Sequence, residues 1–301
     1  MIQSRSEKIY QVVAHIILIL MVFCIAMPFI LLFMSSITDE NTLIQNGYSY
    51  FPAKYSLTAY KYIWNQKAKV FQAYGMTILV TAVGTVINIA MSAMLAYGLS
   101  KAKLPLRRFF AFYVFFTMLF NGGLVPTYMM YTGTFHIKNT VFALIVPAFM
   151  MSAMNVILIR TYYQTSIPDA LYEAAEIDGA GPFKVFTTIA LPLGKPILVT
   201  MGLFAALGYW NDWTNGLYYL SGTEGQKLYT IQNLLNQMMS QIEFLSSNSS
   251  AASAASSDIA KVPQTAVRMA IAFVAMLPML VIYPFLQKYF QKGIALGAVK
   301  G

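Results

Sequence analysis

Six long apolar segments dominate this chain and limit what it can fold into. The hydrocarbon core of a bilayer is roughly 30 Å thick, and a helix needs about 20 predominantly apolar residues to cross it. Segments of this kind cover residues 12–35, 72–98, 109–131, 140–160, 197–217 and 266–287. We therefore expect an all-α integral membrane protein with six transmembrane helices.

The composition agrees with this fold class and excludes several others. Charged residues make up 10% of the 301-residue chain, whereas soluble domains carry about 25%. The net charge of +9 would also suit nucleic acid, but in so apolar a chain cytoplasmic basic loops explain it better. Cys24 is the single cysteine, and His15 and His136 lie far apart without neighbouring metal ligands. We expect no disulfide, no metal site and no nucleic-acid partner.

The distribution of lysine and arginine predicts the orientation. The loop 100–108 carries four positive charges and no negative ones, and short basic loops stay in the cytoplasm. Both termini should then be cytoplasmic. An opposing signal comes from the outer loop 36–71, which holds Lys54, Lys61, Lys67 and Lys69. The first apolar run is too long for a signal peptide and is followed by no small-residue cleavage site, so we expect it to remain as a helix.

Two features interrupt the apolar pattern. Asn121-Gly122-Gly123 and Pro126 break the third segment, and this break either packs helices through small residues or shapes a pathway between them. The second large loop, 218–265, contains a Ser/Ala-rich run at 246–257 that is typical of a flexible or partly helical linker.

A polar stretch between the fourth and fifth segments predicts two short helices. Ser166, Pro168 and Asp169 suit the start of a helix over 168–177, by capping, fixed φ and dipole interaction respectively. Gly179 can adopt the positive φ that ends it. A second helix is expected from Pro182 to residue 190, ended by Pro192. We expect Leu171, Ala174, Ala175 and Ile177 on the packing faces of the first helix.

The same stretch carries a specific motif. It reads Glu-Ala-Ala, three residues, Gly and then Ile-x-Leu-Pro, ending at Pro192. This motif resembles the signature of ABC-importer permeases, and over roughly residues 70–290 the chain resembles the carbohydrate-uptake, maltose-type class. The segment Asn121–Tyr128 resembles its oligosaccharide or polysaccharide branch. The resemblance implies a type I importer permease with a cytoplasmic coupling helix, whose ATPase-coupling residues are Glu173, Ala174, Ala175, Asp178, Gly179, Leu191 and Pro192.

The resemblance also implies an assembly in a bacterial cell membrane. The expected partners are a second, non-identical permease, a dimer of ABC ATPase subunits, an extracytoplasmic solute-binding lipoprotein, membrane lipid and an oligosaccharide. The chain has no phosphate-binding G-x-x-x-x-G-K-[ST] loop, so ATP and Mg²⁺ would bind the partner ATPase, and we expect no cofactor and no catalysis in this chain. We divide it into an N-terminal part (1–71), a permease domain (72–290) and a cytoplasmic tail (291–301).

Candidates for the substrate path lie near the predicted outer ends of the spans. The sequence Tyr-Trp-Asn-Asp-Trp at 209–213 resembles a pattern in sugar permeases, since aromatic faces stack on sugar rings while Asn and Asp bond hydroxyls. Aromatic residues also collect at membrane interfaces without any ligand. A carboxylate near membrane depth usually faces protein or water. The candidates are Asn121, Tyr128, Trp210, Asn211, Asp212 and Trp213.

Three other functions compete with import of an oligosaccharide. An ABC permease for an amino acid, phosphate or a polyamine would share the same coupling motif. An intramembrane enzyme would need a catalytic motif such as HExxH, which this sequence lacks. An ion-driven carrier would show inverted repeats and buried coupling charges, which fit six helices and one coupling segment poorly.

Overall fold

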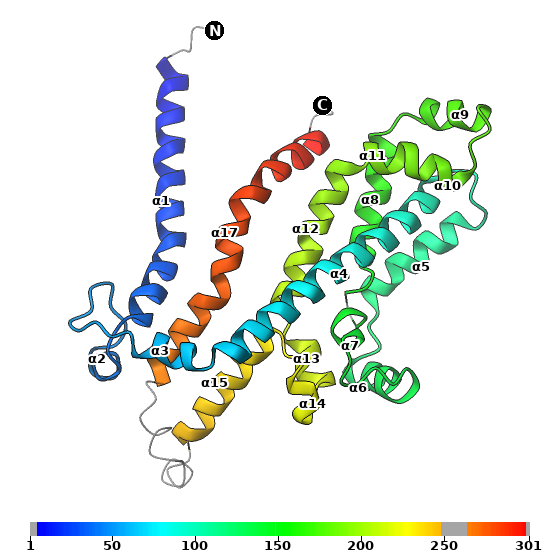
Figure 1. Cartoon of the computed structure of the whole chain (residues 1–301). Coiled ribbons are helices and arrows are strands. Elements are labelled where there is room, and N and C mark those ends of the chain that lie inside the picture. The colour runs from blue at the N-terminus through cyan, green and yellow to red at the C-terminus, as the bar shows by residue number, and fades with distance from the viewer. Residues whose placement is uncertain (1–4, 148, 248–263, 299–301) are drawn as a thin grey trace. The chain divides into compact units, whose positions relative to one another are not determined.

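The computed structural model describes residues 5–147, 149–247 and 264–298, and all regular elements there are helices (Figure 1). The chain divides into two compact units. Unit 1 comprises residues 1–70 and 237–279, and unit 2 comprises residues 71–236 and 280–301. The sequence predicts a domain boundary at residue 71, and this stays a prediction. The two units are defined by contacts alone, and they group residues 237–279 with the N-terminal part.

Unit 1 is built around the beginning of the last long helix. It contains α1 (Arg5–Ser36), α2 (Glu40–Asn46), α3 (Thr58–Asn65) and the first part of α17 (Gln264–Ala298). The Glu40 carboxylate accepts hydrogen bonds from the N–H groups of Thr265 and Ala266, at 2.8 and 2.9 Å. A carboxylate in this position satisfies free N–H groups at a helix N-terminus and interacts favourably with its dipole. The predicted outer loop 36–71 is thus partly helical and tied to α17.

Unit 2 contains most of α4 (Lys67–Ser100) and the shorter helices that follow it. These are α5 (Arg107–Leu119), α6 (Leu124–Met129), η1 (Met130–Thr134), α7 (Phe142–Ile145), α8 (Ala153–Thr165), α9 (Asp169–Ile177), α10 (Pro182–Val185), η2 (Phe186–Ala190), α11 (Leu191–Leu193), α12 (Lys195–Asn211), α13 (Thr214–Tyr219), α14 (Gly222–Gln226) and the first part of α15 (Ile231–Ser247). The predicted linker 246–257 lies almost entirely outside the described residues.

Five of the six predicted segments overlap candidate membrane spans in the described part of the chain, although their bounds differ. By length and composition, three helices can cross a membrane, over Ile9–Ser36, Lys67–Ser100 and Gln264–Ile282. Two bent pairs raise the number to five in the described part of the chain, Arg107–Leu119 with Leu124–Thr134 at 111° and Pro182–Leu193 with Lys195–Asn211 at 80°. The bend in the first pair follows the predicted break at Asn121-Gly122-Gly123.

The exception is the predicted fourth span, 140–160, which is not one helix. It falls on α7 and α8, with non-helical backbone between them. Side chains from other helices bond the carbonyls that this break releases. Tyr209 Oη donates to Ile145 O (2.9 Å), Asn215 Nδ2 to Pro147 O (3.1 Å) and Asn88 Nδ2 to Phe149 O (2.6 Å). Non-helical backbone at membrane depth is tolerated where protein satisfies its polar groups, and these three bonds meet that condition.

A glycine in α4 makes room for the first of these bonds. Tyr209 is fully buried, and its ring lies directly against Gly84, so close that a Cβ at this position would overlap the ring. Relief of such an overlap requires Tyr209 to move, which would pull its hydroxyl away from Ile145 O.

We therefore expect Gly84→Ala to destabilise the protein by about 1–3 kcal/mol, the usual range for overpacking a core. Thermal unfolding of the purified chain in detergent checks this, with a lower midpoint expected. The matched control is Gly75→Ala in the same helix, because the space around Gly75 is open and alanine favours the helix. Equal midpoints for the two variants would contradict the packing argument.

Candidate functional site

The motif-bearing helix α9 begins one residue later than predicted. It covers Asp169–Ile177, and Pro168 precedes it without any side-chain cap. Ser166 is not the cap; it ends α8, where its N–H donates to Tyr162 O at 2.9 Å. Asp169 lies in the first turn of α9, where its charge favours the helix dipole.

The buried face of α9 differs from the predicted one. Tyr172 is only 5% exposed and belongs to the apolar core of unit 2, with Ala175 half-buried beside it. Leu171, Ala174 and Ile177, which the sequence places on the packing faces, are exposed, Ile177 at 86%. The burial of Tyr172 is not predicted by the sequence, because its hydroxyl and the neighbouring acidic residues give this face a polar pattern.

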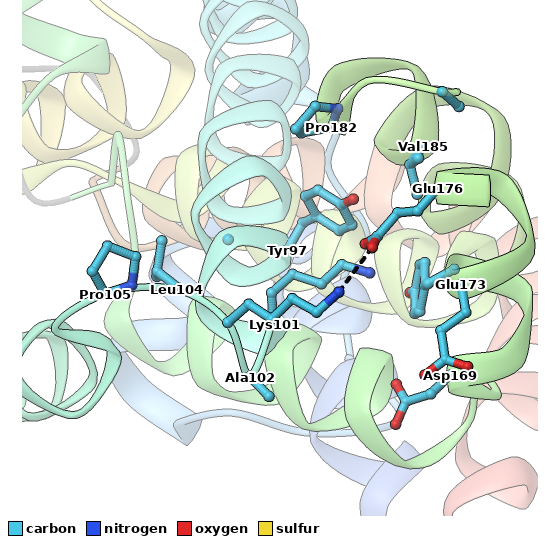
Figure 2. Close-up of a pocket in the computed structure, with 14 residues that line it drawn as sticks. Tyr97, Lys101, Ala102, Leu104, Pro105, Asp169, Glu173, Glu176, Pro182 and Val185 are labelled. Atoms are coloured by element: carbon cyan, nitrogen blue, oxygen red, sulfur yellow. Dashed lines mark hydrogen bonds and ion pairs between the residues drawn. The ribbon is translucent and has the colours of Figure 1, made fainter. Parts of the chain in front are cut away.

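Lys101, the residue directly after α4, contacts the ring of Tyr172. Lys101 Nζ lies 3.0 Å from the centre of the Tyr172 ring and 4.9 Å from that of Tyr97. Figure 2 shows Lys101 extending toward Glu176 of α9, among the residues that line a pocket. The pocket has a volume of about 470 Å³, and its polar lining includes Lys101, Lys103, Asp169, Glu173 and Glu176.

The electrostatics of this pocket reflect its partial burial. Burial lowers the pKa of Lys101, while the nearby carboxylates of Glu176 and Asp169 act in the opposite direction. Burial also raises the pKa of Tyr172 to about 12, with smaller contributions from Tyr97 and Asp169. Tyr172 therefore stays neutral at physiological pH and offers the face of an uncharged ring to the lysine.

A second lysine makes a weaker contact. Lys103 Nζ lies 3.0 Å from Glu176 Oε2, but the lysine side chain is 86% exposed. Exposed ion pairs contribute at most about 1 kcal/mol, so the stronger link between α9 and the loop 101–106 is the contact of Lys101 with Tyr172.

The turn after α9 has the predicted geometry. Gly179 has a φ of +77°, and the N–H of Ala180 donates to Ala175 O at 2.9 Å. Asp178 and Gly179 are exposed. Pro182 then starts α10, as predicted, and Phe183 points outward with 68% of its surface exposed.

Pro192 does not end the second helix, contrary to the prediction. Because proline has no N–H, the helix widens before it into the π turn η2, where Leu191 N–H bonds Phe186 O. The chain then continues through Leu191 and Pro192 in α11. The break comes at Gly194, where a Cβ would lie 2.5 Å from the Tyr163 ring.

The substrate-path candidates are found in several different environments. Asn121 Oδ1 accepts the N–H of Gly123 at 2.9 Å and so stabilises the bend after α5. Tyr128 stacks on Tyr219 with ring centres 5.7 Å apart. Asn211 is exposed and Trp213 is 45% exposed, whereas Trp210 is buried.

Asp212 has a clear structural contact. Its Oδ1 accepts hydrogen bonds from the N–H groups of Thr214 (3.0 Å) and Asn215 (3.2 Å). It therefore fixes the start of α13, in the manner of an Asx turn, and this explains how a buried carboxylate is tolerated there. A contribution of Asp212 to a substrate path remains a prediction.

The comparisons with known proteins agree with this architecture. Residues 105–296, more than half of the chain, match the family described as the binding-protein-dependent transport system inner membrane component. Protein LplC of Bacillus subtilis (strain 168) is 34% identical over 275 residues, which cover 91% of this chain and 89% of LplC. The polygalacturonan/rhamnogalacturonan transport system permease protein YtcP of the same organism is 32% identical over 296 residues, 98% of this chain and 100% of YtcP.

A solved structure extends the similarity to the fold. A chain in the crystal structure of a bacterial ABC transporter involved in the import of the acidic polysaccharide alginate superposes with a TM-score of 0.76 at 28% identity, covering 96% of this chain and 99% of that chain. The predicted all-helical permease fold is thereby confirmed. Membership in this family implies an ATPase and a binding protein as partners, while the chain itself is the non-catalytic inner membrane component. The chain belongs to the family of binding-protein-dependent ABC importer permeases.

Proposed function

We propose that this chain forms half of the translocation pathway of an importer for oligosaccharides or glycan fragments, and that α9 and α10 dock onto its ATPase. The exposed apolar stripe on these helices is the observation that carries the docking proposal. It consists of Leu171, Ala174 and Ile177, which are exposed on α9 while Tyr172 of the same helix is buried, and of exposed Phe183 on α10. Exposed apolar groups of this kind mark a surface that a partner covers.

Carboxylates next to this stripe suit the same partner. Glu173 and Asp178 are exposed, and no ion pair involves either of them in the described part of the chain. They are free to bond an arginine of the ATPase. Ala174 and Ala175 permit close approach, Gly179 makes the turn, and Leu191 and Pro192 lead into α12. All the predicted coupling residues lie between Glu173 and Pro192 in the sequence.

Movement of the docked segment would reach the membrane through its buried side. Tyr172 contacts Lys101, which directly follows α4, and Tyr163 of α8 lies against Gly194 at the start of α12. Closure of two ATPase subunits on ATP and Mg²⁺ would displace α9 and, through these contacts, the neighbouring ends of α4, α8 and α12. This is alternating access, with a second, related permease as the other half and both termini on the ATPase side.

The relatives support a carbohydrate substrate. They include permeases named for polygalacturonan/rhamnogalacturonan, for melibiose, raffinose and stachyose, and for arabinooligosaccharides, and the similar solved transporter imports alginate. An extracytoplasmic binding lipoprotein would deliver the glycan to the outer side of the membrane, opposite the ATPase. Tyr128, Trp210, Asn211, Asp212 and Trp213 remain candidates for the path that it follows, with Asn121 shaping the nearby bend.

The first prediction from the proposed function concerns docking. We expect Ile177→Asp and Glu173→Lys each to abolish uptake and to reduce co-purification of the ATPase at least tenfold, since a buried charge or a reversed charge opposes docking. Membrane insertion should be unchanged. Ile44→Asp is the matched control, because Ile44 is also exposed but lies in α2 of the outer loop. Normal uptake by Ile177→Asp and Glu173→Lys would refute docking through α9.

The second prediction separates docking from transmission. Lys101→Met should leave the ATPase bound but lower transport per ATP hydrolysed by roughly tenfold, since a partly desolvated cation–π contact is lost. Lys103→Met is the matched control, with nearly normal transport, because its ion pair is exposed. Uptake and ATP hydrolysis measured together in proteoliposomes give this ratio. Equal ratios for the two variants would remove Lys101 from the transmission route.

The third prediction concerns the substrate. The complete importer, reconstituted with its binding protein, should take up oligosaccharides in an ATP-dependent manner, and an oligogalacturonide is the first one to test because two similar systems handle acidic glycans. A neutral oligosaccharide of equal length tests the importance of charge. ATP-dependent uptake of an amino acid, phosphate or a polyamine, without uptake of either glycan, would overturn the substrate class but leave the coupling mechanism standing.

A further inference from the structure

Three arginines surround a second cavity close to the coupling segment. Arg107 and Arg108 lie in the first turn of α5, and Arg160 lies on α8. Together they line a cavity of about 660 Å³, whose remaining lining is apolar and comes from Ala102, Leu104, Leu106 and Ala111. The cavity lies on the α9 side of unit 2. The loop 101–106, which lines part of the cavity, is held to α9 by the ion pair of Lys103 with Glu176.

The positive charge of this cavity is not compensated within the described part of the chain. No carboxylate lines the cavity, and none of the three arginines belongs to an ion pair there. Arg160 Nε is buried without a hydrogen-bond partner among the described residues, and the charge of Arg107 repels that of Arg160. Arg107 and Arg108 also lie at the positive end of the α5 dipole. An anion would relieve each of these costs.

The backbone before the arginines is held in an unfavourable conformation next to a capping hydrogen bond. Arg107 Nε donates to Leu99 O at 3.0 Å and thereby caps the end of α4. Leu106, just before the arginines, has a φ of +55°, which is unfavourable for a residue with a branched side chain. This turn directs the chain so that Arg107 and Arg108 follow immediately at the start of α5.

Exposed apolar side chains lie in and next to the arginine cavity. Leu106, which lines it, is 70% exposed, and Phe109 and Phe110, which follow the two arginines along α5, are also exposed. Arginine guanidinium groups bind phosphate oxygens in a forked, charge-assisted geometry. A phosphate joined to acyl chains fits a cationic cavity with such apolar neighbours better than a free, hydrated phosphate does.

We propose that this arginine cavity binds the phosphate of an anionic phospholipid from the leaflet on the ATPase side. The assignment of the leaflet rests on the proposed function, because docking of α9 defines the ATPase side. Basic clusters next to membrane helices recognise anionic headgroups in this way. The bound lipid would hold the corner between α4 and α5 at a fixed depth, beside the contact of Lys101 with Tyr172.

Native mass spectrometry of the delipidated importer complex tests this proposal. Phosphatidylglycerol and phosphatidylcholine of equal chain length are added separately to the wild type and to the variants Arg108→Gln and Arg108→Gln/Arg160→Gln. We expect the wild type to prefer phosphatidylglycerol and its affinity to fall roughly fivefold for each arginine removed. Lys138→Gln removes one exposed charge elsewhere in unit 2 and should retain the wild-type preference.

Several results would overturn the proposal. The first is equal binding of phosphatidylglycerol by the wild type and both variants. If the double variant unfolds, the single variant Arg108→Gln still gives this comparison, because Arg108 is exposed. The second is competition by inorganic phosphate at the concentration of the lipid, which would make free phosphate the ligand. The third is loss of a protein subunit from the arginine variants with lipid preference unchanged, which would make the cavity a protein contact. Since lipid binding needs no transported substrate, failure of glycan uptake would not affect this result.

Discussion

The fold of unit 2 depends on the hydrogen bonds that satisfy the backbone carbonyls of its broken segment, 140–160. In hydrocarbon, a carbonyl outside a helix has no water to bond, and each unsatisfied group costs several kcal/mol. Tyr209, Asn215 and Asn88 come from three different helices and bond the carbonyls of Ile145, Pro147 and Phe149. The break between α7 and α8 therefore joins α4, α12 and α13, and the chain can turn at membrane depth without losing these bonds.

The same requirement shapes the end of α4. Its terminal carbonyls have no partners within the helix, and Arg107 bonds that of Leu99 while Gln164 of α8 bonds that of Ser100. These bonds bring α5 and α8 to the point from which Lys101 reaches Tyr172. The corner that receives α9 is thus positioned by the capping of a membrane helix.

Hydropathy and the coupling motif were sufficient to predict the helical membrane fold, the short helix near 169–177 and the turn at Gly179, because these depend on local sequence. Pro147 predicts a kink within 140–160. The full break was not predictable, since it depends on side chains of Asn88, Tyr209 and Asn215 that are distant in sequence. The same applies to Tyr172, whose buried side depends on Lys101 from another loop. The four positive charges of that loop were visible in the sequence, but they indicated orientation and not contact with α9.

Under the proposed docking, the two faces of α9 would have different tasks, rigid attachment to unit 2 on one side and exchangeable contact with the ATPase on the other. Contacts made inside the unit, by Tyr172 with Lys101 and by the core, are partly desolvated and so are stronger than exposed ion pairs. Glu173 and Ile177 are exposed, and under the proposed docking a bond formed there with a partner would replace water and could be broken again in each cycle. If the strengths were reversed, movement of the partner would separate α9 from the unit before α4 moved. The proposed coupling role therefore requires charged residues on the exposed side of α9 and an aromatic anchor on the buried side, and α9 has both.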